Sequence, residues 1–61
     1  MRYSELEKEL RKIGCYIVKE GARHTMWYSP ITGEQFPVGR HKTEEVPIGT
    51  LKSIKRAAGL K

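Results

Sequence analysis

Several residue types that commonly build active sites are scarce in this chain of 61 residues, which contains no aspartate and no asparagine. Its single cysteine, Cys15, cannot form a disulfide within the chain, and nothing points to an oxidising compartment. The two histidines, His24 and His41, lie far apart in the sequence, so no spacing typical of a zinc site is present. We therefore expect neither a metal ion nor another cofactor.

Long hydrophobic runs and the motifs of common hydrolases are also missing. No apolar stretch approaches the roughly 20 residues that span a bilayer, and the first ten residues carry three glutamates where a signal peptide would be apolar. No serine stands in a Gly-x-Ser-x-Gly setting, and the glycines lack the lysine pattern of a phosphate loop. These absences predict a cytoplasmic protein without a membrane segment, and they argue against serine-hydrolase triads and nucleotide-binding loops.

Positive charge is present in excess. Twelve lysine and arginine residues against seven glutamates give a net charge of +5 and an isoelectric point near 9.7. Such an imbalance in a short chain predicts a polyanion or an acidic protein as the partner. The 38% of hydrophobic residues is enough for a folded globule, and the length predicts one domain over residues 1–61 with a shallow site.

An amphipathic helix is predicted near the N-terminus. Ser4 and Glu7 have the Ser-x-x-Glu spacing of a capping box, which would place the start of the helix at the serine. The apolar residues that follow at helical spacing are Leu6, Leu10 and Ile13. Gly14 is placed to end this helix.

A second helix is predicted at the C-terminus. Its apolar stripe consists of Leu51, Ile54 and Ala58. Gly59 follows the stripe as a stop signal. Basic residues lie elsewhere on the same segment, so the helix combines an apolar face with a cationic one.

Three short strands are predicted between the helices, at residues 15–18, 24–29 and 34–38. Pro37 cannot donate a ladder hydrogen bond, so the third strand should lie at an edge or the proline at its end. Residues 39–47 are almost free of apolar side chains and predict a solvated loop. The order α-β-β-β-α predicts an α+β fold, in which an antiparallel sheet carries both helices on one face and leaves the other for a ligand.

His24 is the main candidate for chemistry. RNA can be cleaved by attack of a ribose 2′-hydroxyl on the adjacent phosphate, which requires a group that exchanges a proton near neutral pH and cations that stabilise charge. His24 follows the turn Gly21-Ala22-Arg23 at the start of a predicted strand, where a side chain can be held rigidly yet face solvent. The residues alone also allow a plainer interpretation, a surface or half-buried histidine without a role.

Other basic residues are candidates for contacts with RNA phosphates. They are Arg23, Arg40, His41, Lys42, Lys52, Lys55, Arg56 and Lys61. His41 can be a second proton donor, a phosphate contact or a solvated side chain, and a run of charge can also be no more than a solvated helix face. Trp27 and Tyr28 should point to opposite faces of their strand, with Trp27 in the core and Tyr28 able to stack on a base.

Much of the chain resembles one family of toxins. The segments are 20–30 (Glu-Gly-Ala-Arg-His-Thr-Met-Trp-Tyr-Ser-Pro) with Gly33 after it, 38–41 (Val-Gly-Arg-His), 49–54 (Gly-Thr-Leu-Lys-Ser-Ile) and 58–60 (Ala-Gly-Leu). Together they resemble the HicA family of type II toxin-antitoxin systems. The resemblance implies a double-stranded-RNA-binding-like fold, mRNA interferase activity and His24 as the catalytic residue.

The same resemblance implies partners. A cognate HicB-like antitoxin would cover the catalytic face in a hetero-oligomer, and operator DNA would be contacted only through that complex. Our leading hypothesis is thus a metal-independent endoribonuclease that cleaves mRNA with His24 as general acid or base. The alternatives are a non-catalytic RNA-binding module of the same fold, and an interaction module whose basic surface meets only an acidic protein.

Overall fold

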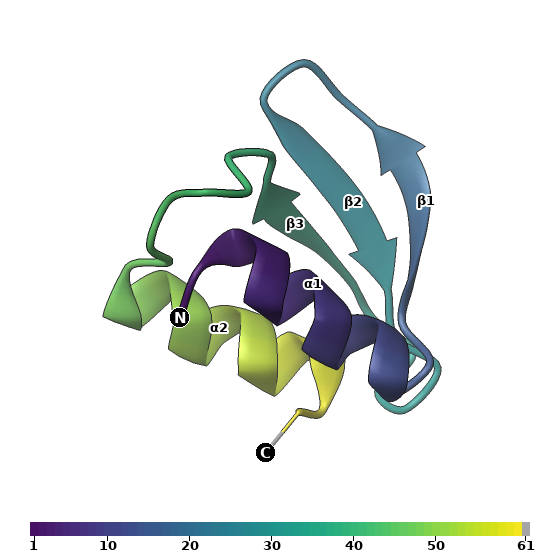
Figure 1. Ribbon diagram of the computed structural model, residues 1–61. Coiled ribbons are helices and arrows are strands. Elements are labelled where there is room, and N and C mark those ends of the chain that lie inside the picture. Colours follow the sequence, from purple (N-terminus) through teal and green to yellow (C-terminus); the bar gives the residue numbers. More distant parts are fainter. Residues whose placement is uncertain (61) are drawn as a thin grey trace.

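The computed structural model describes residues 1–60, so Lys61, one of the predicted basic residues, lies outside it. The elements are α1 (Tyr3–Lys12), β1 (Tyr16–Glu20), β2 (His24–Tyr28), β3 (Gln35–Gly39) and α2 (Ile48–Ala58). Both helices pack against one face of the sheet (Figure 1). This arrangement confirms the predicted α-β-β-β-α fold.

The three strands form an antiparallel sheet in the order β1-β2-β3. Trp27 in the central strand lies opposite Ile17 on β1 and Phe36 on β3. The register between β1 and β2 shifts between Ile17 and Lys19, which marks a β-bulge at Val18. Since β3 is an edge strand, Pro37 stands where a missing donor is tolerated, as its residue type predicts.

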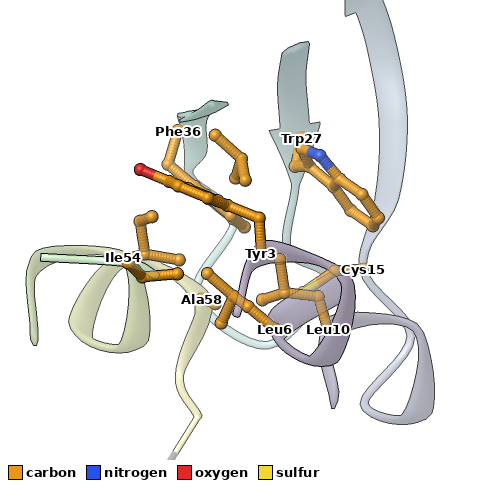
Figure 2. Packing of buried hydrophobic residues seen from close by; sticks show 10 residues of the cluster. Tyr3, Leu6, Leu10, Cys15, Trp27, Phe36, Ile54 and Ala58 are labelled. Atoms are coloured by element: carbon orange, nitrogen blue, oxygen red, sulfur yellow. The ribbon is translucent and has the colours of Figure 1, made fainter. Parts of the chain in front are cut away.

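The core lies between the sheet and the two helices (Figure 2). Trp27 is only 1% exposed, which confirms its predicted place in the core. Side chains from the apolar stripes of both helices meet it and the neighbouring β3 side chains. These helix residues are Leu6 and Leu10 of α1 and Ile54 and Ala58 of α2. One sheet face therefore carries the packing with the helices.

The predicted start of the first helix is wrong. Helix α1 begins at Tyr3 rather than after Ser4, and it is Glu5 whose carboxylate accepts a hydrogen bond from the Arg2 amide, at 2.8 Å. The amides of Tyr3 and Ser4 donate to the carbonyls of Glu44 and Lys42, at 3.1 and 3.0 Å. Because a distant segment satisfies these amides, the helix does not need a serine cap.

The segment after β3 is also less solvated than predicted. Residues 40–45 are exposed, but Val46 is buried in the core at 5% exposure. Glu45 forms an isolated antiparallel bridge with Arg2, and its carboxylate pairs with the N-terminal ammonium group at 2.9 Å. This loop therefore anchors the start of α1 to the end of the sheet.

Candidate active site

His24 lies at the first position of β2, directly after the turn that joins β1 to β2. The Gly21 amide donates a hydrogen bond to the His24 carbonyl at 2.9 Å and closes this turn. The turn projects beyond the helices (Figure 1), and the His24 side chain is exposed. The imidazole is thus within reach of a large ligand, while its backbone is held in the sheet.

The strand alternation places His24 on the sheet face opposite the helices. Thr25 and Trp27 are buried against the helices, so the side chains of His24, Met26 and Tyr28 point the other way. Residues paired directly across the strands share that face, except at Gly39, whose Cβ position is directed toward Tyr3 of the core. We call this surface the open face, and its residues are Tyr16, Lys19, His24, Met26, Tyr28, Gln35 and Pro37.

Aromatic and cationic groups stand on the open face together. The rings of Tyr16 and Tyr28 are neighbours, with centroids 5.5 Å apart and planes inclined by 50°. Lys19 is exposed beside them, and Arg23 is exposed in the turn next to His24. None of the open-face residues carries a carboxylate, so the surface combines stacking area with positive charge.

Arg40 fixes the turn that presents His24. Its guanidinium donates a hydrogen bond to the Gly21 carbonyl at 2.6 Å and lies 3.9 Å from the Glu20 carboxylate. It therefore ties the end of β3 to the β1–β2 turn. Arg40 was predicted to bind phosphate; the two contacts direct its guanidinium toward the turn, and 46% of the side chain remains exposed.

Gly39, the residue paired with His24 across β2 and β3, packs closely on the first helix. A Cβ atom added there would lie 3.1 Å from Cζ of Tyr3, closer than nearly all real contacts of this kind. A Cβ atom at this position would require the tyrosine ring to shift by a few tenths of an ångström. The backbone beside His24 is held against α1 by this close packing.

A concave surface, distinct from the open face, lies on the helix side of the sheet. It is a groove of about 190 Å³ whose lining residues are Glu7, Arg11, Ile17, Glu20, Thr25, Trp27, Arg40 and Lys42. The Arg11 guanidinium lies 5.1 Å above the Trp27 ring, a cation–π contact. Cations and carboxylates both line the groove, which contains Lys42 but not the side chain of His24.

The structure separates the cations of the second helix from His24. Lys52, Lys55 and Arg56 belong to α2, which packs on the covered face of the sheet. The sheet itself stands between them and the open face. His41 and Lys42 are exposed in the loop after β3. Among the predicted basic residues that the structure describes, Arg23 directly precedes His24 in the chain, and its side chain is exposed.

Three residues that the sequence analysis did not select belong to these surfaces. Tyr16 and Lys19 lie on the open face, and Arg11 lines the helix-side groove. Strict alternation along β1 would place Tyr16 and Lys19 on opposite faces, but the bulge at Val18 brings them to the same one. The tyrosine was detectable as an aromatic residue in a predicted strand, whereas the lysine had no such signal.

The arrangement of side chains and helices also bears on metal binding and on membrane insertion. Among residues 1–60, no group of three or more histidine, cysteine or acidic side chains is placed to hold a metal ion. No helix in the same part of the chain has the length and apolar character needed to cross a membrane. Cys15 is buried at 3% exposure and contributes to the core.

Comparison with known protein families gives one match that covers nearly the whole chain. Residues 3–60 match the family described as the HicA toxin of bacterial toxin-antitoxin systems. The matched range includes all five elements of the fold and the whole open face. Searches of curated proteins and of solved structures find no match to the chain.

Proposed function

We propose that this chain, which belongs to the HicA toxin family of bacterial toxin-antitoxin systems, is an endoribonuclease. In this proposal it cleaves mRNA with His24 as its catalytic residue. The observation that carries the proposal is the position of His24. Its side chain is exposed on the face of the sheet that the helices leave free, at a turn closed by a backbone hydrogen bond. An imidazole that a polynucleotide can reach, on a backbone held in the sheet, suits proton transfer.

In the proposed reaction the nucleophile comes from the substrate. The ribose 2′-hydroxyl loses its proton to a base and attacks the adjacent phosphorus, and the bond from phosphorus to the 5′-oxygen breaks. The 5′-oxygen leaves with a proton, which gives a cyclic phosphate and a free 5′-hydroxyl. His24 serves as general base or acid in this exchange, without a metal ion. Arg23 stabilises the negative charge that accumulates on the phosphate oxygens.

The remaining basic residues have supporting roles in the proposal. Arg40 keeps the turn in place through the Gly21 carbonyl and Glu20. The predicted phosphate contacts on α2 act from the far side of the sheet, so they attract RNA by their charge rather than by touching the reacting phosphate. Their positions are Lys52, Lys55 and Arg56. His41 and Lys42 can contact flanking phosphates from the loop after β3.

The family implies an antitoxin partner for this chain. We propose that this partner is a cognate HicB-like protein, that it covers the face bearing His24 in a hetero-oligomer, and that operator DNA is bound only through the complex. The proposed setting is the cytoplasm, where both the antitoxin and mRNA are available. All of residues 1–61 serve as a single toxin domain in this proposal.

The test compares wild type with a His24→Ala variant in cells and in solution. We expect wild type to arrest growth and fragment mRNA, and His24→Ala to do neither. His41→Ala shows whether the second histidine takes part. Fluorescence of the single, buried Trp27 reports whether each variant is folded. A chelator should leave cleavage by the purified protein unchanged.

Two results would contradict the proposal. Equal toxicity of wild type and a folded His24→Ala variant would remove the assigned role of the histidine. Purified wild type that binds RNA without cleaving it would favour the alternative function, a non-catalytic RNA-binding module. The supporting observation for that alternative is the tyrosine pair on the open face, of which Tyr16 is exposed.

A further inference from the structure

We propose that the open face is the path of the substrate and that it selects single-stranded RNA, whose bases stack on Tyr28 and Tyr16 at the other end of β2 from His24. This inference rests on the proposed function, because it takes RNA as the substrate. It adds the path of the RNA over the sheet and names two residues that would select single strands over duplexes.

The first support is aromatic surface on the open face, which no other element within residues 1–60 covers. Tyr16 is 51% exposed, and its ring lies 5.5 Å from that of the half-buried Tyr28. The pair forms an aromatic platform on the same face as His24. Aromatic side chains bind unstacked bases of any sequence through their π-faces.

The second support is the distribution of charge between the two sides of the sheet. Lys19 lies next to the platform, Arg23 and His24 lie at the other end of β2, and no carboxylate lies among the open-face residues. The groove on the helix side contains the carboxylates of Glu7 and Glu20 beside its cations. A polyanion therefore meets less electrostatic opposition on the open face.

The third support is the geometry of the central strand. Side chains two residues apart on one face are about 6.8 Å apart, so Tyr28 lies roughly 13.6 Å along β2 from His24. A strand laid along β2 could thus place one phosphate at the histidine and a base farther along on the tyrosines. In a duplex the bases are stacked and paired inside the helix, so their faces are not available to stack on the tyrosine rings.

The experiment measures RNA binding by a catalytically inactive full chain, the His24→Ala variant. The probe is a fluorescein-labelled oligoribonucleotide of mixed sequence, offered as a single strand and annealed to its complement. Tyr28→Leu and Tyr16→Ser remove the rings, whereas Tyr28→Phe and Tyr16→Phe keep them. Each ring removed should weaken binding of the single strand by about 5- to 100-fold, and each phenylalanine variant should bind nearly as wild type.

A matched pair of lysines tests the charge argument. Lys19→Gln removes one exposed cation from the open face, and Lys8→Gln removes one exposed cation from α1. Both variants lower the net charge by one, so Lys19→Gln should weaken RNA binding more than Lys8→Gln does. Trp27 fluorescence checks the fold, and the more exposed Tyr16 keeps the test decisive if Tyr28→Leu fails to fold.

Several outcomes would overturn the inference. These are equal or tighter binding of the duplex, equal effects of Lys8→Gln and Lys19→Gln, and single-strand binding that survives removal of both rings. A wild-type dimer that Tyr16→Ser dissociates, seen by light scattering, would make the face an interface between copies instead.

The same variants in the cleavage assay separate this inference from the proposed function. If wild type cleaves RNA and the ring-removed variants do so with unchanged KM, only the inference fails. If ring removal abolishes single-strand binding but wild type does not cleave, the nuclease function fails and the open-face inference stands.

Discussion

At the scale of single residues, two arginines near His24 carry the same charge in different surroundings. The Arg40 guanidinium contacts the Gly21 carbonyl and the Glu20 carboxylate. Arg23 is exposed, and no hydrogen bond or ion pair within residues 1–60 engages its side chain. The first therefore holds the turn, and the second is available to a phosphate.

Substitution of Arg40 should impair cleavage through the position of the turn. In Arg40→Gln we expect the cleavage rate to fall by about ten- to a hundredfold, because small displacements of a catalytic group cost that much. Hydrogen exchange at the Gly21 amide, which is bonded to the His24 carbonyl, should become faster. Arg40→Lys should recover part of the rate, since it keeps the charge but not the forked geometry.

The contrary result would identify Arg40 as a phosphate ligand. In that case Gly21 exchange would stay as in wild type, and binding of single-stranded RNA would lose salt dependence by about 0.7 in logarithmic slope. Arg23→Gln serves as the comparison, because its exposed side chain should change binding without altering the exchange at Gly21.

At the scale of elements, α2 depends on its C-terminal end and on packing. Its N-cap, Pro47, provides no side-chain hydrogen bond, and its first turn has no acidic residue. At the other end Gly59 adopts a left-handed conformation with φ of 79°, and the Leu60 amide donates to the Lys55 carbonyl at 2.9 Å. This closure satisfies a carbonyl that the helix leaves free.

Two glycines of this region should respond oppositely to alanine. Gly59→Ala combines a left-handed backbone with a Cβ atom placed 2.8 Å from Cγ2 of Ile31, so we expect a loss of about 1–3 kcal/mol in the free energy of unfolding. Gly49 lies inside α2, and a Cβ there meets no atom within 4 Å. Gly49→Ala should therefore raise the free energy of unfolding by about 0.5–1 kcal/mol. Urea denaturation measures both, and equal effects would refute the assignment of the helix end.

The bridge between the N-terminus and the loop after β3 should make stability depend on pH. A hydrogen bond from the N-terminal ammonium of Met1, together with its charge, lowers the pKa of Glu45 below the ordinary value of 4.5. A carboxyl whose pKa is lower in the folded state stabilises the fold above its unfolded pKa. That contribution is lost as the pH falls through the lower folded pKa.

Glu45→Gln tests this dependence. The variant should be slightly less stable than wild type at about pH 7, and the difference should vanish in acid, where the glutamate is protonated. Glu44→Gln is the control, because its side chain is also exposed and lies next in the chain. A difference between Glu45→Gln and wild type that is the same at both pH values would contradict the role of the ion pair.

At the scale of the whole molecule, the sheet divides the protein into a packed side and a free side. The helices and the buried apolar side chains occupy one side, and His24 with the tyrosine pair occupies the other. The net charge of +5 acts over the whole surface, because fields in water extend about 10 Å at moderate salt. In the proposed function, attraction of RNA and the chemical step therefore involve different regions.

Charge removal from α2 should reveal this division. We expect a Lys52→Gln, Arg56→Gln double variant to bind RNA more slowly, by about tenfold or less at low salt, with kcat for cleavage largely retained. The deficit should shrink at high salt, where exposed charges are screened. Stopped-flow association and single-turnover cleavage measure the two steps, and a large fall in kcat would place α2 at the reacting phosphate.

Local patterns in the sequence were sufficient for much of the architecture. The spacing of Leu6 and Leu10 predicts α1, Gly59 marks the end of α2, and Trp27 takes its core position by alternation with Tyr28. These features depend on backbone periods and on conformations set by neighbouring residues, so they are readable without knowledge of the fold. The exposed position of His24 after its turn follows from the same local rules.

Tertiary structure alone decided which sheet face the helices cover and which residues from distant parts of the chain contact one another. The start of α1 depends on carbonyls of Lys42 and Glu44, and the role of Arg40 depends on Glu20 and Gly21. The bulge at Val18 moved Lys19 to the face of His24. Such contacts join residues far apart in the chain, or follow from a shift of strand register, and neither has a signature in local spacing. Order and periodicity were thus determined by the sequence itself, whereas the composition of the open face was set by long-range packing.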